Sequence, residues 1–403
     1  MTQTRLYLFD DGVARRWAPF TLTRPAGELR YGCLTPCERA ARIFGGPVSG
    51  QLSRRALEGF DEPGAAPVVQ PDDIDKDGLR LLLSSRAVPD FQVLPPLREG
   101  RITVAGRTVG WVLAPGTPVP PDAVLRAPES ATEGPSVALQ GEIVEHPWHL
   151  VAGTPGRIAK DVVTLFLDDH EPEGVIRIGK GELSMSAKAE IEPGVVVDTR
   201  NGPVRLDDGV RVEGPARLVG PLYVGRDTMI FGGTVGTSSI GPVCKVRGEV
   251  ADAVLLGFVN KAHDGHLGHA MLGCWVNLGA GTINSDLKNN YGTVRVWTPD
   301  GEKDTGLVKV GCFLGDHVKT SIGTLLNTGT VVGAGSNVFG GTMPSKVVPP
   351  FSWGTGPDLR DYRFDKFLEA AEASMARRGQ TLTPGVRRVL AQAWQRTRTR
   401  RAE

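Results

Sequence analysis

The sequence predicts a left-handed parallel β-helix over most of the C-terminal two-thirds, preceded by an α/β domain and followed by helices. The first observation is a six-residue repeat of aliphatic or small residues that begins near residue 204 and fits neither helical spacing nor strand alternation. In such a fold each hexapeptide forms one short strand and a corner, three hexapeptides make one triangular coil, and successive coils stack. The second observation is the content of 52 glycines and 30 prolines, which suits a chain with many tight corners.

The repeat holds one phase, is interrupted, and then resumes in a second phase. The first phase comprises Val204, Val210, Ala216, Leu222, Thr228, Thr234, Ile240 and Val246. The second comprises Leu272, Leu278, Val308, Leu314, Thr320, Leu326, Val332 and Val338. We expect these side chains to point into the prism. A β-sandwich is the alternative, but its turns recur about every 8–12 residues and would not keep one phase.

The flanking segments differ in pattern and give the domain boundaries. We expect an α/β domain at 1–145, a helical linker at 146–172, the β-helix at 173–348 and a helical tail at 349–403. In the first domain, strands are expected at 6–11, 92–95 and 108–113 and a helix at 38–44. In the tail, helices are expected at 362–378 and 384–397. Residues 285–307 are polar and break the repeat, which predicts a loop extruded from one face, where repeat proteins often bind ligands.

Composition excludes several function classes. The formal net charge of +1 gives no sign of nucleic-acid or membrane-surface binding. The sequence has no signal peptide and no apolar run of about 18 residues, so we expect a cytoplasmic protein. The five cysteines are scattered, which does not suit a disulfide framework, and Cys33 and Cys37 lack the second ligand pair of a zinc site.

The densest polar stretch inside the repeat is Asn260–His269, which contains Lys261, His263, His266 and His269. The glycine-rich segment Val276-Asn-Leu-Gly-Ala-Gly-Thr282 follows it. A neutral imidazole is the natural proton acceptor near pH 7. Closely approaching glycine backbone can supply N–H groups to a developing oxyanion. This combination suits an acyl transfer in which an amine attacks a thioester.

Val276–Thr282 resembles the V-N-I-G-A-G-T segment of the acetyltransferase domain in the GlmU-like family. These are bifunctional glucosamine-1-phosphate acetyltransferases and N-acetylglucosamine-1-phosphate uridyltransferases. A divergent bacterial branch of sugar nucleotidyltransferase-like proteins is more similar still. The segments that carry this wider resemblance are 23–32, 260–265, 285–292 and 349–354.

The resemblance implies a role for each polar residue in acetyl transfer from acetyl-coenzyme A, within UDP-N-acetylglucosamine biosynthesis. His263 stands where the family places its catalytic histidine, and the acyl-coenzyme A would lie along the glycine segment. The remaining assignments are Gly279, Ala280 and Gly281 for the coenzyme, Asn277, Asn289, Asn290 and Tyr291 for sugar hydroxyls, and Lys261 and Lys288 for a sugar phosphate. Proteins of this kind form homotrimers with sites between subunits.

Two alternatives concern these same residues. His263, His266 and His269 are also considered as a metal trio, and Asn277 as a structural corner residue, since asparagine tolerates left-handed backbone. In addition, the family's N-Y-D-G after the glycine segment is replaced by Asp286–Asn289, which leaves open a sugar other than glucosamine 1-phosphate.

The N-terminal domain lacks the glycine-rich strand-turn of sugar nucleotidyltransferases and has Phe9-Asp-Asp-Gly12 in its place. Arg24 and Arg30 are candidates to hold the phosphates of a nucleoside triphosphate, and Asp10 and Asp11 to hold Mg²⁺. Alternatively, Arg24 pairs locally with Glu28 and the domain is degenerate or allosteric.

Three functions follow from the sequence. The preferred one is acetylation of an amino sugar phosphate. The others are a sugar nucleotidyltransferase whose β-helix only oligomerises, and a non-catalytic scaffold that binds a sugar nucleotide.

Overall fold

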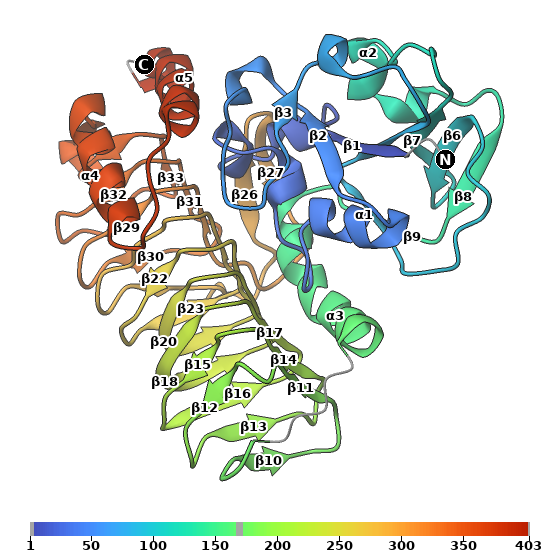
Figure 1. Cartoon of the computed structure of the whole chain (residues 1–403). Helices are drawn as coiled ribbons and strands as arrows, with labels where there is room; N and C mark the ends of the chain where they lie inside the picture. The colour runs from blue at the N-terminus through green and yellow to red at the C-terminus, as the bar shows by residue number, and fades with distance from the viewer. Residues whose placement is uncertain (1–3, 167–171, 402–403) are drawn as a thin grey trace.

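The computed structural model describes residues 4–166 and 172–401. It contains an N-terminal α/β domain, a long parallel β-helix and two C-terminal helices (Figure 1). The predicted fold class is therefore confirmed. Within the described residues, no helix is both long and apolar enough to cross a membrane.

The N-terminal domain is built on a seven-stranded mixed sheet in the order β3-β2-β1-β4-β7-β6-β8. Its strands are β1 (Arg5–Phe9), β2 (Val48–Leu52), β3 (Val68–Val69), β4 (Arg80–Ser84), β6 (Gly100–Val104), β7 (Arg107–Leu113) and β8 (Ser136–Leu139), with β5 (Ala87–Pro89) and β9 (Gly141–Ile143) forming a separate pair. Strands β1 to β4 are mutually parallel, whereas β7 runs antiparallel to both β4 and β6. Helices α1 (Pro36–Phe44) and α2 (Asp122–Arg126) complete the domain.

One expected strand of this domain is wrong. Residues 92–95 form an irregular connection between β5 and β6, and Val93 is 97% exposed. Pro95 ends this segment and Pro96 follows it. Because proline has no backbone N–H to donate, this part of the chain is unsuited to pair with a neighbouring strand. The expected helix at 38–44 and the expected strand at 108–113 both lie within observed elements.

Helix α3 (Pro147–Leu165) links the domain to the β-helix and packs against its strands β17, β19 and β21. It occupies most of the expected helical linker, whose residues 167–171 lie outside the described residues. The segment that follows β1 also contacts the β-helix, because the Thr23 hydroxyl donates to Asp316 at 2.7 Å and the Ser239 hydroxyl donates to the Gly32 carbonyl at 2.6 Å. This segment therefore packs directly against the β-helix.

The β-helix consists of short parallel strands stacked coil upon coil. One ladder comprises β11 (Leu183–Met185), β14 (Val204–Leu206), β17 (Leu222–Val224), β19 (Ser239–Ile240), β21 (Val254–Leu255), β24 (Met271–Leu272), β28 (Phe313–Leu314), β31 (Val331–Val332) and β33 (Val347–Val348). The first coils of the other faces comprise β10 (Ile176–Ile178), β12 (Glu190–Ile191), β13 (Val196–Asp198), β15 (Arg211–Val212), β16 (Ala216–Val219), β18 (Met229–Gly236) and β20 (Lys245–Ala251). The later coils add β22 (Asn260–Lys261), β23 (His266–Gly268), β25 (Ile283–Asn284), β29 (Lys319–Thr320), β30 (Leu325–Leu326), β32 (Asn337–Val338) and β34 (Ser352–Trp353).

Most predicted inward positions form one continuous core, but two predictions are wrong. Thr234 is exposed and Val235 points inward instead, because the pairing of β18 with β20 shifts register between Ile230 and Gly233. Val308 is 43% exposed because it still belongs to the insertion. That insertion carries the hairpin β26 (Arg295–Thr298) and β27 (Gly301–Asp304).

The C-terminal helices α4 (Phe364–Ala376) and α5 (Pro384–Arg401) follow the last parallel strand and a short antiparallel strand, β35 (Arg360–Asp361). Phe367 of α4 packs against Phe351 with ring centroids 5.1 Å apart, so α4 covers a side of the last coils. Val389 of α5 packs with Leu57 and Phe60 of the N-terminal domain. Helix α5 thus brings the C-terminal part of the chain into contact with the N-terminal domain.

Candidate functional site

Two corners of the β-helix hold the predicted acetyl-transfer residues. Corner A comprises residues 262–265, 279–282 and 321–324 of three successive coils. Corner B comprises residues 269–270, 285–286 and 327–330, and the insertion leaves the prism there. Strands β23, β25 and β30 form the face between the two corners.

Corner A brings His263 together with the glycine segment. The Gly281 N–H donates to the Asp264 carbonyl at 3.0 Å, so the segments 262–265 and 279–282 of corner A stack one coil apart. His263 is exposed, and its ring has no hydrogen-bond or ion-pair partner among the described residues. A Cβ on Gly279 would lie 2.4 Å from the Ser321 backbone, so glycine is needed for this close stacking.

The glycine segment offers fewer backbone donors than its sequence suggests. The Gly279 N–H donates to the Thr320 carbonyl at 3.1 Å, and the Gly281 N–H is held by Asp264. In the described structure the Ala280 N–H has no acceptor. Ala280 is therefore the one of the three residues with a backbone donor available to an oxyanion.

Lys261 holds the backbone of corner A through hydrogen bonds from its ammonium group. Its side chain is buried, and its ammonium group donates to the Arg247 carbonyl at 2.9 Å and to the His263 carbonyl. Burial lowers the pKa of Lys261 to about 8. This ammonium group positions the backbone of His263, and it is not presented to solvent as a point charge for a sugar phosphate.

Asn277 lies on the strand face that leads into corner A. Its side-chain oxygen accepts from the Asn260 amide at 2.8 Å, which gives it a structural contact between two coils. Lys319 pairs with Asn277 in the next coil, and burial lowers the pKa of that ammonium group. The sequence analysis missed Lys319, although its place just before Thr320 of the repeat marks it as facing outward.

Corner B holds a chain of acids and histidines whose mutual contacts the sequence analysis did not predict. His269 Nδ1 lies 2.7 Å from the Asp286 carboxylate, which is 3.9 Å from His266 Nε2. Glu249 lies 3.3 Å from His266, and Asp252 lies 3.7 Å from His269. The contact with His269 lowers the pKa of Asp286.

The alternative of a metal trio does not fit the structure. His263 precedes β23, His266 lies on it and His269 follows it, so the three rings are spread along a whole face. The described part of the chain holds no group of three or more His, Cys, Asp or Glu that could bind a metal ion.

The insertion begins at corner B with the residues predicted to hold the sugar. Lys288 donates to the Thr293 carbonyl, and the Asn290 side-chain oxygen accepts from the Gly292 N–H at 3.1 Å. Asn289 is exposed and Tyr291 is 72% exposed. These side chains are separated from His263 by the face that β25 forms between corner A and corner B. A single subunit therefore does not bring all the predicted residues together.

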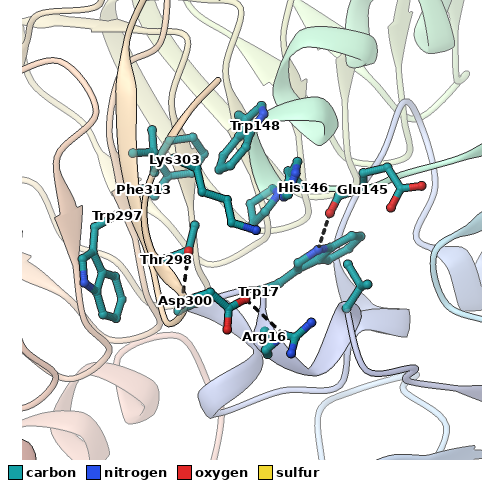
Figure 2. A pocket seen from close by; sticks show the side chains of 14 residues that line it. Arg16, Trp17, Glu145, His146, Trp148, Trp297, Thr298, Asp300, Lys303 and Phe313 are labelled. Carbon is teal, nitrogen blue, oxygen red and sulfur yellow. Dashed lines mark hydrogen bonds and ion pairs between the residues drawn. The ribbon is translucent and has the colours of Figure 1, made fainter. Parts of the chain in front are cut away.

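A cavity between the N-terminal domain and the hairpin β26–β27 was not expected from sequence (Figure 2). Trp17 donates through Nε1 to the Glu145 carbonyl at 3.2 Å, and Arg16 pairs with Asp300 of the hairpin at 3.3 Å. His146 stacks on Trp148 at 4.2 Å. The insertion thus contacts both the β-helix and the first domain.

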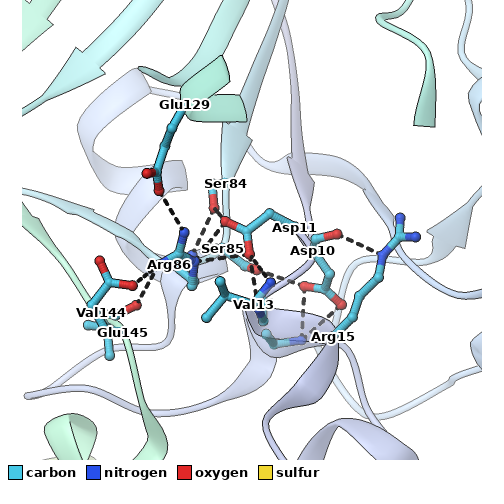
Figure 3. Close-up of polar contacts among 12 residues, drawn as sticks. Asp10, Asp11, Val13, Arg15, Ser84, Ser85, Arg86, Glu129, Val144 and Glu145 are labelled. Carbon is cyan, nitrogen blue, oxygen red and sulfur yellow. Dashed lines mark hydrogen bonds and ion pairs between the residues drawn. The ribbon is translucent and has the colours of Figure 1, made fainter. Parts of the chain in front are cut away.

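Asp10 and Asp11 do not fit a magnesium site, which corrects that expectation (Figure 3). Asp11 is 1% exposed and accepts from Arg86 Nε at 2.7 Å. Asp10 is 3% exposed and accepts from the Ser85 hydroxyl at 2.7 Å and from Ser53. Burial raises the pKa of Asp10. Both carboxylates are already satisfied by protein donors away from solvent.

Arg24 and Arg30 are buried rather than open to a nucleotide. Arg24 is 2% exposed and pairs with Asp316 at 3.0 Å and with Glu62 at 2.8 Å. The alternative of a local pair with Glu28 is wrong, because the partners of Arg24 come from the β-helix and from a distant loop.

Arg30 is 4% exposed and donates to the Cys33 carbonyl at 2.5 Å, with its guanidinium 5.2 Å from the Tyr223 ring centroid. In this arrangement, a phosphate would have to displace protein partners to reach either guanidinium.

Comparison with known proteins agrees with this two-part organisation. Residues 6–168, less than half of the chain, match the model of a family described as sugar nucleotidyl transferase. The bifunctional protein GlmU of Acaryochloris marina is 26% identical over 204 residues, which is 45% of this chain and 41% of the relative. The chain resembles the GlmU-like family.

Two further relatives have bifunctional names. GlmU of a Sulfurovum species is 32% identical over 143 residues, covering 32% of this chain and 33% of the relative. A bifunctional sugar-1-phosphate nucleotidylyltransferase/acetyltransferase of Sulfurisphaera tokodaii is 28% identical over 100 residues, covering 25% of each chain. The chain therefore spans no more than about two-fifths of the length of these relatives.

Among solved structures, an N-acyltransferase from Bacillus cereus, AntD, in complex with dTDP-4-amino-4,6-dideoxyglucose and coenzyme A, is 18% identical. The alignment covers 49% of this chain and 90% of that one, with a TM-score of 0.23.

Proposed function

We propose that the chain transfers an acetyl group from acetyl-coenzyme A to the amine of an amino sugar phosphate at corner A. The observation that carries this proposal is the stacking of His263 one coil from Ala280, with an imidazole that is exposed and free of protein partners. The resemblance to bifunctional GlmU proteins supports it. Acetyl-coenzyme A as co-substrate is consistent with a cytoplasmic location.

The mechanism assigns each group one task. The amine nitrogen attacks the thioester carbonyl carbon, and the His263 imidazole accepts the proton that the amine loses. The Ala280 N–H donates to the oxygen of the tetrahedral intermediate. The C–S bond then breaks, and the coenzyme A thiolate takes the proton back from the imidazolium. Lys261 keeps the His263 backbone in place through the donated hydrogen bond described above.

We further propose that the working unit is a homotrimer. Within one subunit, His263 and the segment Lys288–Tyr291 stand at opposite edges of one face. A neighbouring subunit packed against that face would bring its own insertion to corner A. Asn289, Asn290 and Tyr291 would then contact the sugar from across the interface, with Lys288 near its phosphate.

The test is release of free thiol from acetyl-coenzyme A with a panel of amino sugar 1-phosphates. We expect His263→Ala to reduce kcat by at least about 100-fold, within the usual range for a general base. His149→Ala removes a histidine of α3, remote from corner A, and should leave the rate unchanged. Thiol release that is equal in both variants would contradict the role of His263.

A second candidate function is sugar nucleotidyl transfer in the N-terminal domain, favoured by the family match over residues 6–168. It predicts release of pyrophosphate from a nucleoside triphosphate and a sugar 1-phosphate. If neither thiol nor pyrophosphate is released, the remaining alternative is a non-catalytic scaffold.

A further inference from the structure

The cavity between the N-terminal domain and the hairpin β26–β27 has aromatic walls that are held in place by protein contacts (Figure 2). Trp17 is 3% exposed and is fixed by its hydrogen bond to the Glu145 carbonyl. Trp148 is 2% exposed and stacks on the His146 ring. Phe313 of the β-helix lines the same space. Ligand pockets are usually pre-formed in this way, with mostly apolar walls and a few polar groups.

The size of the cavity limits what it can hold. Its volume is about 110 Å³, and it is partly open to solvent. In another protein, a closed apolar cavity of roughly 150 Å³ is enough to bind benzene. The open side leaves room for a substituent on the ring. The space therefore suits one planar ring that carries a small group.

Lys303 of β27 brings an unpaired charge to this cavity. Its side chain is partly buried, and Figure 2 shows its ammonium group directed toward His146 and Trp17. Among the described residues, this ammonium group has no ion-pair or hydrogen-bond partner. Burial lowers the pKa of His146 to about 4, so the ammonium group faces a neutral imidazole near pH 7. A partly desolvated cation without a counter-ion is unfavourable, and a bound anion offsets that cost.

The other charged side chains that line the cavity are already compensated. Arg16 and Asp300 pair with each other at the solvent-exposed rim, 3.3 Å apart. The Glu145 carboxylate is held by Arg86 at 2.6 Å and by Arg107 at 2.5 Å. Lys303 therefore remains the uncompensated charge of the described lining, and a ligand with a single negative charge would balance it.

Helix α3 begins at this cavity and adds to the attraction for an anion. His146 is the N-cap residue, Pro147 follows it in the first turn, and no side chain caps the helix there. The N-terminal end of a helix carries a partial positive charge that favours anions. This effect acts in the same direction as the ammonium group of Lys303.

We propose that the cavity binds a small planar carboxylate, an acid with one aromatic ring. The ring lies against the indole of Trp17, and the carboxylate accepts a charge-assisted hydrogen bond from Lys303. Because Trp17 belongs to the N-terminal domain and Lys303 to the insertion, the ligand holds the hairpin against the first domain. The site is separate from corner A and does not depend on acetyl transfer.

The first test is isothermal titration calorimetry of the full chain with benzoate and with two analogues that separate charge from shape. Benzamide keeps the ring and lacks the charge, whereas cyclohexanecarboxylate keeps the charge and lacks the planar ring. We expect saturable binding of benzoate and at least about tenfold weaker binding of benzamide, as for loss of a charge-assisted hydrogen bond. Cyclohexanecarboxylate should also bind more weakly. Absence of saturable benzoate binding, or equally tight binding of either analogue, would overturn the proposal.

Two variants of the hairpin have opposite expected effects on benzoate binding. Lys303→Met should weaken it by at least about tenfold, because the ammonium group is lost. Asp300→Asn should tighten it several-fold, because a negative charge leaves the rim, and a folding defect would not produce this gain. Lys309→Met is the matched control, since Lys309 belongs to the same insertion and does not line the cavity. Equal effects of the two lysine variants, or weaker binding by Asp300→Asn, would contradict the site.

Hydrogen exchange locates the bound probe on the chain. Benzoate should slow the exchange of backbone amides at 295–304 in the wild type, because the ligand holds the hairpin against the first domain. The same concentration should have no such effect in Lys303→Met. Slower exchange that is confined to other segments would place benzoate elsewhere and refute the assignment.

Discussion

The candidate site residues of the N-terminal domain and the candidate base of the β-helix have opposite surroundings. Arg24 is 2% exposed and Asp11 is 1% exposed, and both have protein partners in full. His263 at corner A is exposed and has no partner for its ring among the described residues. Arg24 stabilises the contact between the N-terminal domain and the β-helix, and Asp11 holds Arg86 within the N-terminal domain, whereas His263 is available to a substrate. Residue type alone does not separate these roles, but burial and partners do.

The largest effect expected from this comparison is on stability. Arg24→Met leaves Asp316 and Glu62 without their guanidinium partner, and breaking a buried pair in this way costs about 3–5 kcal/mol. Urea unfolding should show this loss as a lower midpoint. The matched control is Arg5→Met, since the Arg5–Asp75 pair is solvent-exposed and its loss should leave the urea midpoint nearly unchanged. Equal losses in the two variants would contradict a structural role for Arg24.

A smaller effect is expected on the pH dependence of stability. Burial raises the pKa of Glu28 to about 7 from 4.5, so the folded state holds a proton that the unfolded state has lost. The free energy of unfolding should therefore fall as pH rises from about 4.5 to 7, and this contribution should be constant above that range. Glu28→Gln should lack this component in urea titrations at a series of pH values. Parallel pH profiles for the two proteins would show that Glu28 does not titrate in this way.

The smallest effect on stability is expected in the insertion. Tyr291 is 72% exposed, so Tyr291→Ala should change the free energy of unfolding by no more than about 0.5 kcal/mol. If the tyrosine contacts the sugar of a neighbouring subunit, KM for the amino sugar phosphate should rise several-fold while KM for acetyl-coenzyme A stays constant. An unchanged sugar KM would remove Tyr291 from the binding site.

The β-helix was predictable because its inward residues recur locally, as Leu314, Leu326 and Val338 do in the core. The repeat predicted the wrong inward residue at Thr234, because the register shift in the strand pairing cannot be recognised from the six-residue spacing. The partners of Arg24 were not predictable, because Asp316 lies 292 residues away in sequence. The histidine and aspartate contacts of corner B were missed for a similar reason: the stacking of coils, and not sequence spacing, brings Asp286 to His269.

The most direct measurement of this contrast is a paired one, in which thiol release and the urea midpoint are recorded for His263→Ala and Arg24→Met side by side. We expect each variant to lose one of the two properties and to keep the other. His263→Ala should lose at least about 100-fold in kcat and keep the wild-type midpoint. Arg24→Met should lose stability and keep its kcat under conditions in which it is folded. A fully active His263→Ala protein, or a folded Arg24→Met protein that has lost acetyl transfer, would contradict the account.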